Sequence, residues 1–416
     1  MNTFFTDKDG RKYYSKSEYY QVLLQKSGLF KATKVLDSEN FLGTSPPSIF
    51  VGSKLRYPAV NVGILSPAYK NDMAWLYDNP NEWVKRDFGI RQVAEFRTSL
   101  INSRFETRVS EAKNQGKLLE TAQEIGMSIK QLDVEIMLKK KPRAMPDFDQ
   151  IRLPMGPAAP IKKAILAENS KIPKKVDKVV DDVDLKAVEA IDYLYDAGFN
   201  EHSLTQLLSI GVLGAKKNRK LVSTRWSITT VDDMLGKKLI KKIKDYRTID
   251  EYMLFSGNYF GNYYYILMFP NVWQYELFEG YLPRSLWNQE ATLKWSTDWE
   301  SIFGRKNYAF ATAGGYYSVR YPTAQYLYSM KRQASVLVIR FETPEYTIPL
   351  GVWVCRESTR KALASKPFIF KLQDELLTYT KKLIYGKFRY NIDEVLKLSK
   401  LLGNVKGQRR LFEFSS

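Results

Sequence analysis

Residues able to do chemistry concentrate in a few segments of this 416-residue sequence. One segment, KKNRKLVSTRWSITTVDDMLGKKL at 216–239, joins a basic run to hydroxyl side chains and two adjacent acids. We expect a short strand through Arg225 that leads into a helix, a junction at which hydroxyls and helix amides can hold an anion. Asp232 and Asp233 can also bind magnesium. The alternative is that Asp232 or Thr230 caps the helix and Arg225 pairs internally.

A second segment, 311–357, contains two adjacent glycines followed by several arginines and glutamates. Gly314 and Gly315 permit a tight turn before a helix, so their backbone amides, together with Arg320, can hold a phosphate or a sugar. The other interpretation is a βαβ-like core whose helix ends are capped and whose charges pair internally.

These segments lead to a catalytic hypothesis. If 53–57, 225–233 and 314–320 meet in the fold, they can line a pocket for a nucleotide, a metal ion or a modified base. The protein would then be a DNA- or nucleotide-processing enzyme, and only under that hypothesis do we expect magnesium; otherwise we predict no cofactor. The candidate catalytic residues are Ser53, Lys54, Arg56, Arg225, Ser227, Asp232 and Asp233.

The last fourteen residues, GNVKGQRRLFEFSS, predict a peptide that binds a sliding clamp. One helical turn places Gln408, the aliphatic Leu411 and the aromatic Phe414 on one face, where they can fill a pocket. The second aromatic that is usual in such peptides is absent because Ser415 stands there, and Phe412 can contribute instead. A segment of this kind can also dock on its own protein.

Scarce residues exclude other chemistry. Because the chain has one cysteine and one histidine, it can form neither an internal disulfide nor a Cys- or His-based zinc site, and we predict no metal. We expect Cys355 to pack in the core and His202 to be a surface or capping residue at the start of a helix. No segment reaches the ~20 apolar residues that cross a bilayer, so we expect no membrane contact. The scarcity of cysteine fits a cytoplasmic protein.

Positive charge is unevenly distributed along the chain. The formal net charge is +19, and two segments, 139–178 and 216–247, carry fifteen of the nineteen excess charges. Such a concentration predicts a surface that binds nucleic-acid phosphates with salt-dependent affinity. The alternatives are lysine-rich solvated faces, as in heat-stable proteins, and RNA in place of DNA as the ligand. The nucleic-acid-binding candidates are Lys216, Lys217, Arg219, Lys220, Lys237, Lys238, Lys241 and Lys242.

Hydrophobic patterning predicts an α/β or α+β protein, with a largely helical N-terminal lobe packed on a mixed-sheet C-terminal lobe. We expect an N-terminal helical extension at 1–40, an N-terminal lobe at 41–213 with a proline-rich basic connector at 142–175, a C-terminal lobe at 214–402 and a flexible tail at 403–416. Strands are expected at 49–51, 60–65, 263–269, 273–278, 335–341 and 350–354. Helices are expected at 13–29, twice or more within 88–141, and at 184–213, 316–333, 356–364 and 391–402.

Several long motifs resemble one family. FVGSKLRYPAVNVGILSP, PMGPAAP, RKLVSTRWSITTVDD, and GGYYSVR through KRQASVLVIRFETPEYTIPLGVWVCRE occur in order along nearly the whole chain, which is similar to the archaeal Nre DNA repair proteins. One Nre subtype carries a Cys-rich zinc element, so the single cysteine resembles the zinc-free NreA subtype. The resemblance implies DNA damage repair and a C-terminal motif for the clamp PCNA, which falls on Gln408, Leu411 and Phe414. It transfers no catalytic residue.

Overall fold

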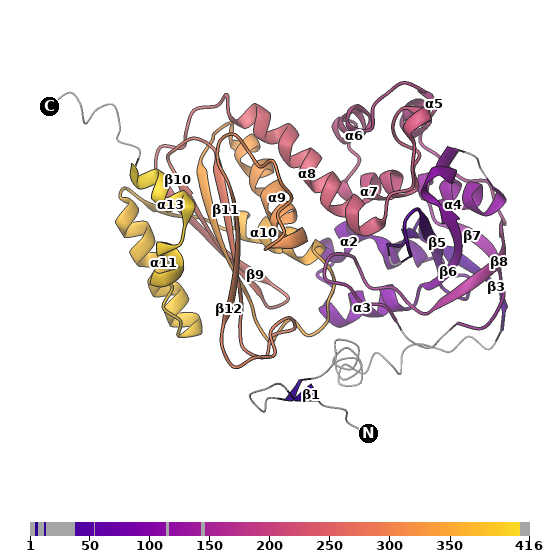
Figure 1. Ribbon diagram of the computed structural model, residues 1–416, viewed down its shortest axis with the longest axis horizontal. Coiled ribbons are helices and arrows are strands. Elements are labelled where there is room, and N and C mark those ends of the chain that lie inside the picture. The colour runs from indigo at the N-terminus through magenta and orange to yellow at the C-terminus, as the bar shows by residue number, and fades with distance from the viewer. Residues whose placement is uncertain are drawn as a thin grey trace. The chain divides into compact units, whose positions relative to one another are not determined.

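The computed structural model describes residues 38–407 except 54, 114–115 and 143–145, together with a short antiparallel pair, β1 (Phe5–Thr6) and β2 (Lys12–Tyr13). This chain divides into two compact units (Figure 1). Unit 1 comprises the described residues up to Val231 together with Thr347–Gly351, and unit 2 comprises Asp232–Tyr346 and the described residues from Val352 onward. Most of the predicted N-terminal extension, including the expected helix at 13–29 apart from Tyr13 of β2, lies outside the described residues, as do Lys54 and the four clamp-binding candidates.

Unit 1 is built on a six-stranded sheet in the order β3-β7-β8-β6-β5-β4. All neighbouring strands are antiparallel except β6 and β8, which run parallel. The expected strands at 49–51 and 60–65 are confirmed and form an antiparallel pair. The strands are β3 (Asn40–Ser45), β4 (Ile49–Val51), β5 (Ala59–Ser66), β6 (Ile101–Arg108), β7 (Leu132–Leu138) and β8 (Ala158–Leu166).

Short helices connect and cover these strands. Two of them, α6 and α7, confirm the helical period predicted at 184–213. The α-helices are α2 (Pro80–Lys85), α3 (Ile90–Thr98), α4 (Lys117–Met127), α5 (Lys174–Asp181), α6 (Ala187–Asp196) and α7 (Glu201–Ser209). Three 3-10 helices accompany them among the described residues, η2 (Ala74–Asp78), η3 (Val109–Lys113) and η4 (Lys216–Asn218).

The strands of unit 1 correct the expected balance between helix and sheet. The mixed α/β class is confirmed, but the expectation of a largely helical N-terminal lobe understated its strands. Within 88–141, α3 and α4 are helical as expected, whereas β6 and β7 occupy the rest of a segment for which the pattern predicts only helices. In β7, side chains alternate between buried and more exposed, which is the period of a strand with one covered face. The expected helix end near Lys141 is therefore wrong.

The central PMGPAAP motif forms a close backbone crossing in unit 1. Gly156 donates its amide to the carbonyl of Leu100 at 3.0 Å. A Cβ at this position would lie 2.4 Å from the carbonyl oxygens of both Thr98 and Leu100, so only glycine fits without moving backbone. The crossing sets the start of β8 beside β6, and the segment at 142–175, expected to be a proline-rich basic connector, contains the strand β8.

Unit 2 contains a second six-stranded sheet, in the order β12-β11-β13-β10-β9-β14. Only β11 and β13 run parallel to each other. The strands expected at 263–269, 273–278 and 335–341 are confirmed. The strands are β9 (Tyr252–Tyr259), β10 (Asn262–Phe269), β11 (Gln274–Tyr281), β12 (Lys294–Glu300), β13 (Ser335–Glu342) and β14 (Phe368–Phe370).

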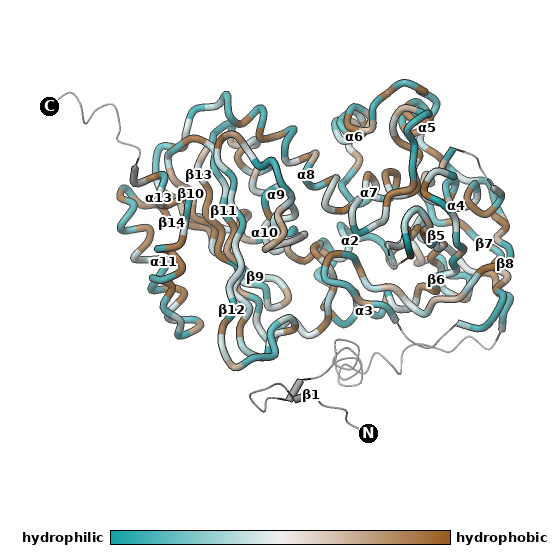
Figure 2. Tube along the Cα trace, in the orientation of Figure 1, coloured by the Kyte–Doolittle hydropathy of each residue, from teal (hydrophilic) through white to brown (hydrophobic). Residues whose placement is uncertain are grey.

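Helices cover both faces of this sheet, with α9 and α10 on one side and α11 and α13 on the other (Figure 1). All eight residues of β13 are consequently buried, and the tube is brown, meaning hydrophobic, along much of the central strands (Figure 2). Leu337, Ile339 and Phe341 pack against the helices that follow β14. The helices are α9 (Ala313–Met330), α10 (Trp353–Leu363), α11 (Gln373–Phe388), α12 (Asp393–Lys397) and α13 (Lys400–Gly407).

Two local expectations fail around the longest helix and the cysteine. The predicted strand through Arg225 is wrong, because α8 (Thr224–Ile243) is helical from Thr224 and carries Thr230 and Asp232 in its interior, where neither can be the cap. The predicted strand at 350–354 is also wrong, since α10 begins at Trp353. Cys355 is buried, as expected, on that helix. Among the described residues, none of the helices combines the length and hydrophobicity that a membrane span requires.

Candidate nucleic-acid interface

Three segments of unit 1 meet at the start of α8. They are the loop between β4 and β5 at 52–58, the end of β6 with η3 at 108–113, and the stretch that leads into α8 at 216–226. Backbone and hydroxyl hydrogen bonds join all three, so segments far apart in sequence form one surface. The joining contacts are Val51 N to Thr224 Oγ1 at 2.9 Å, Val109 N to the Pro58 carbonyl at 3.0 Å and Leu221 N to the Val109 carbonyl at 2.9 Å.

Six cations lie on or beside these joins, and we call them the basic face: Arg56, Arg108, Lys113, Lys217, Lys220 and Arg225. The first five are exposed, and none of those five forms an ion pair with any residue that the structure describes. Lys113 donates to the main-chain carbonyl of Lys217, which leaves its charge unneutralised. Arg225 reaches Asp149 at 3.5 Å but keeps 42% of its side chain exposed. Unpaired surface cations of this density suit phosphate groups.

Two large aromatic side chains accompany the basic face. Tyr57 is 72% exposed and Trp226 is 48% exposed, although aromatic residues of this size are usually mostly buried. Tyr57 lies next to Arg56 in the loop, and Trp226 follows Arg225 at the start of α8. Cations for the backbone and aromatic rings for the bases are the two components of single-strand binding surfaces.

The eight predicted nucleic-acid-binding residues fall on both units. In unit 1, Lys217 and Lys220 belong to the basic face, and Lys216, which is also exposed, directly precedes Lys217 in the chain. Arg219 instead holds the chain together, donating to the carbonyls of Gly214 and Val180, both at 2.7 Å. Its guanidinium is therefore engaged in the fold.

The other four belong to the part of α8 in unit 2. Lys237 forms an ion pair with Asp233 at 2.6 Å, and the Lys242 ammonium lies 5.3 Å from the Tyr328 ring centroid. Lys241 and Lys242 are exposed, whereas Lys238 is partly buried.

The catalytic candidates are separated by their surroundings. Ser53 and Arg56 are exposed in the loop between β4 and β5, close in the fold to Arg225 through the contact of Val51 with Thr224. Ser227 is fully buried and its Oγ donates to the Val222 carbonyl at 3.5 Å. Within unit 1 the structure thus brings the segment 53–57 to the start of the segment 225–233. The Ser227 hydroxyl is buried and does not reach the surface that these segments share.

Both acids of α8 are held by arginines in unit 2. The buried carboxylate of Asp232 accepts two hydrogen bonds from Arg356, at 2.8 and 2.7 Å. Asp233 accepts from Arg320 at 2.5 Å and from Lys237 at 2.6 Å. These cations occupy the positions that a magnesium ion would need. Among the described residues, no group of three or more His, Cys, Asp or Glu side chains could hold a metal ion.

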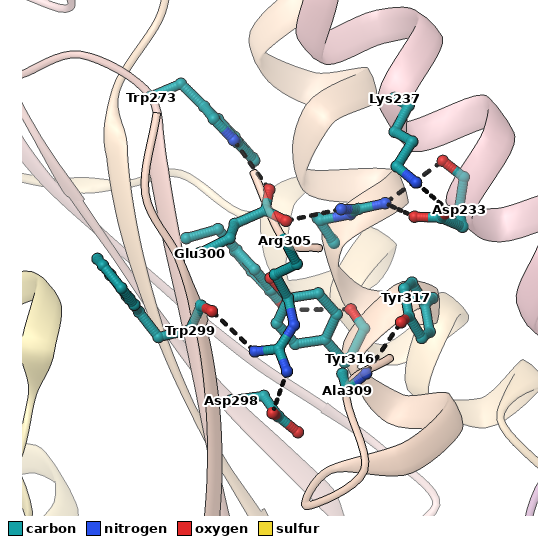
Figure 3. Close-up of polar contacts among 12 residues, drawn as sticks. Asp233, Lys237, Trp273, Asp298, Trp299, Glu300, Arg305, Ala309, Tyr316 and Tyr317 are labelled. Carbon is teal, nitrogen blue, oxygen red and sulfur yellow. Dashed lines mark hydrogen bonds and ion pairs between the residues drawn. The ribbon is translucent and has the colours of Figure 1, made fainter. Parts of the chain in front are cut away.

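A polar cluster contains Asp233, Trp273 and Glu300 (Figure 3), and both of these acids accept hydrogen bonds from Arg320 of α9. Arg320, which is almost fully buried, donates to Glu300 at 2.7 Å, and Glu300 accepts from the Trp273 indole at 3.1 Å. The glycine pair expected to bind phosphate lies in the first turn of α9. A Cβ at Gly315 would lie 2.4 Å from a carboxylate oxygen of Glu279, so this turn faces an acid that would repel phosphate.

A second buried cluster centres on Arg340 of β13. Its guanidinium donates to Glu279 at 2.5 Å and to Glu342 at 3.0 Å, and also to the side-chain oxygen of Asn262. Burial raises the pKa of Glu342 to about 8, and Glu279 adds to the rise while Arg340 opposes it. Glu342 therefore stays largely protonated at neutral pH. The Arg340 guanidinium therefore lies between two buried acids, Glu279 and Glu342.

Two protein-family models together match most of this chain. The model for the N-terminal part of archaeal Nre proteins matches residues 15–288, and that for the C-terminal part matches residues 300–414. The chain belongs to the archaeal Nre family. It is 39% identical to the DNA repair protein NreB of Archaeoglobus fulgidus, over 90% of this chain and 92% of that protein. No solved structure matches this Nre chain significantly.

Two NreA proteins are also similar to this Nre chain. The DNA repair protein NreA of Archaeoglobus fulgidus is 39% identical over 88% of this chain and 90% of that protein. NreA of Haloferax volcanii is 37% identical over 79% of each chain. Because NreA and NreB of one organism are equally similar, identity does not separate the subtypes, and the single cysteine remains the ground for expecting the NreA subtype.

The geometry adds what the family motifs alone did not indicate. The first motif forms the β4–β5 pair and the third begins α8, and the hydrogen bond between Val51 and Thr224 joins them. Arg108 and Lys113 were missed as candidates because they lie in neither charged segment. Arg108 ends β6, the strand that pairs with β5, and Lys113 ends η3, which follows directly; this placement in the structure identifies them.

Proposed function

We propose that this Nre chain is a DNA repair factor that the sliding clamp PCNA recruits through the C-terminal tail. The relatives are named DNA repair proteins, which supports a repair role here. The observation that carries clamp recruitment is the spacing of Gln408, Leu411 and Phe414, directly after the last helix. We also expect the protein to act in the cytoplasm, where archaeal DNA is found.

The helix that precedes the tail is firmly attached to unit 2, which suits a tether. The Glu276 carboxylate of β11 accepts from the amides of Lys400 and Leu401, both at 3.1 Å, and from the Ser399 hydroxyl at 2.5 Å. Leu401 and Leu402 are buried beneath it. A tail that starts from a fixed point would raise the local concentration of the protein at the clamp, and so at DNA.

Removing the apolar anchors of the tail is expected to abolish clamp binding. In Leu411→Ala/Phe414→Ala, affinity for PCNA should fall at least about a hundredfold, because anchors of this kind carry most of the energy of a peptide interface. Calorimetric titration with purified clamp measures the change. Glu413→Ala is the matched control, since it alters the same segment outside the motif. Equal clamp affinity in both variants would assign the tail another role.

DNA contact through the basic face is the second part of the proposal. In Arg56→Ala/Lys217→Ala/Lys220→Ala, affinity for single-stranded DNA should fall and its dependence on salt should weaken, by a slope of about 0.7 per lost phosphate contact. Fluorescence anisotropy over a salt series measures both. Lys366→Ala/Lys371→Ala removes exposed cations from unit 2 and should change little. An unchanged slope in the first variant would remove the basic face from DNA binding, and tighter binding to RNA would favour RNA as the ligand.

The enzymatic alternative, a pocket made from 53–57, 225–233 and 314–320, stays a prediction. The acids proposed for it face arginines, and the glycine turn faces Glu279. We therefore prefer the recruited repair factor.

A further inference from the structure

Unit 1 contains a cavity that the proposed function does not use. Its volume is about 610 Å³, within the range of about 300 to 1,000 Å³ that is typical of small-molecule sites. The lining comes from η2 and the turn into α2, from the end of α4 and from the start of α7. Trp75 and Phe199 contribute aromatic surface, while His202, Asn79, Asn200 and Ser203 contribute polar groups.

One polar wall of the cavity is a histidine held by a buried carboxylate. Asp78 has 3% of its side chain exposed and forms an ion pair with Arg97 at 2.7 Å. The Nε2 atom of His202 lies 3.1 Å from the same carboxylate, and Gln206 Nε2 donates to it at 3.3 Å. Burial by itself would raise the pKa of Asp78, but the charge of Arg97 and the contact with His202 outweigh burial and lower it. Asp78 is therefore a charged acceptor that fixes the imidazole ring.

This arrangement corrects the expectation that His202 is a surface or capping residue. The cap of α7 is Asn200, and His202 lies in the first turn with 28% of its side chain exposed. Nε2 is engaged by Asp78, whereas Nδ1 has no partner among the described residues. With the proton on Nε2, Nδ1 is a hydrogen-bond acceptor available to a ligand.

Two asparagines supply matching donors. Asn200 Oδ1 accepts from Ser203 N at 2.8 Å, and Asn79 Oδ1 accepts from Glu82 N at 3.3 Å, so each side chain is fixed by capping a helix. Capping uses only the oxygen of each amide. Both amide nitrogens have no partner within the described part of the chain, and both residues line the cavity.

We propose that this cavity binds a single nucleotide, either free or turned out of a DNA strand. The edge of a nucleobase alternates acceptors and donors, which complements two amide donors and one imidazole acceptor. Trp75 and Phe199 provide apolar contact for its ring. Because Arg97 neutralises Asp78, the buried wall suits an uncharged base, while exposed Lys130 at the lining suits a phosphate.

The test removes one donor while keeping the helix cap. Asn200→Asp and Asn200→Ser both retain an oxygen that can cap α7, and serine does so without added charge. Asn391→Asp is the matched control, since Asn391 accepts from Asp393 N at 2.8 Å in unit 2. The probes are the four deoxynucleoside monophosphates in calorimetry, and duplex DNA carrying one 2-aminopurine, whose fluorescence rises when the base leaves the stack.

We expect both Asn200 variants to lose about tenfold in affinity or to lose the fluorescence rise, with Asn391→Asp unchanged. A loss confined to the monophosphates identifies a free nucleotide, and a loss confined to the DNA probe identifies an extruded one. No binding of either probe by the unaltered protein, or equal binding by all variants, would overturn the proposal. Clamp titration of the same samples is independent of this result, so failure here leaves clamp recruitment standing.

Discussion

Replacing Arg340 with methionine is expected to lower the free energy of unfolding of unit 2 by about 3–5 kcal/mol, the usual cost of leaving a buried charge without its partner. Arg340 is only 6% exposed and donates to Glu279, Glu342 and Asn262. Because Glu342 is largely protonated at neutral pH, the carboxylate left uncompensated would be Glu279. Urea unfolding followed by tryptophan fluorescence measures the change.

The matched comparisons separate charge from packing. Lys382→Met removes an exposed cation from α11 and should change the free energy of unfolding by less than about 0.5 kcal/mol. Adding Glu279→Gln to Arg340→Met removes the stranded charge and should recover a large part of the loss. If Arg340→Met unfolds like Lys382→Met, the Arg340 cluster contributes little to the stability of unit 2.

The sheet of unit 2 was readable from the sequence because its central strands are covered on both faces. Residues 263–269 and 335–341 form nearly continuous apolar runs, the pattern of strands buried on both sides. The run at 350–354 has the same composition but enters α10. Short apolar runs do not distinguish a strand from the start of a buried helix.

The position of Asp232 inside α8 could not be predicted, for a different reason. Asp232 looked like a helix cap because an acid beside hydroxyl residues usually is one. Its actual partner, Arg356, lies 124 residues further along the chain. A pattern read over neighbouring residues cannot predict a partner so far away in the sequence. The adjacent acids Asp232 and Asp233 therefore predicted a metal site, whereas their carboxylate oxygens accept hydrogen bonds from arginines.

The sequence predicted most of the cations of the candidate interface, but it did not predict which segments lie side by side there. Charge counting identified Lys217 and Lys220, and the motifs identified Arg56. Their convergence depends on the contact of Val51 with Thr224, between residues 173 positions apart. Counting also could not show that Arg219 is used to hold carbonyl groups, which removes one cation from the predicted set.

Unit 1 contains its own buried ion pair, and breaking it is expected to have a comparable effect. Arg97→Met should lower the free energy of unfolding of unit 1 by about 3–5 kcal/mol. Arg97 and Asp78 have 5% and 3% of their side chains exposed and lie 2.7 Å apart. Arg97 also donates to the Pro154 carbonyl at 3.0 Å, so the substitution loosens the PMGPAAP crossing as well. Urea unfolding measures the loss.

The same helix provides the control. Arg91 of α3 pairs with Glu95 at 3.0 Å, but 65% of its side chain is exposed, so Arg91→Met should cost less than about 0.5 kcal/mol. In Arg97→Met/Asp78→Asn, the stranded carboxylate is gone and much of the stability should return. That double variant also removes the charge that fixes His202, so nucleotide binding should stay weak after the fold recovers. Recovered binding together with recovered stability would mean that Asp78 supports only the fold.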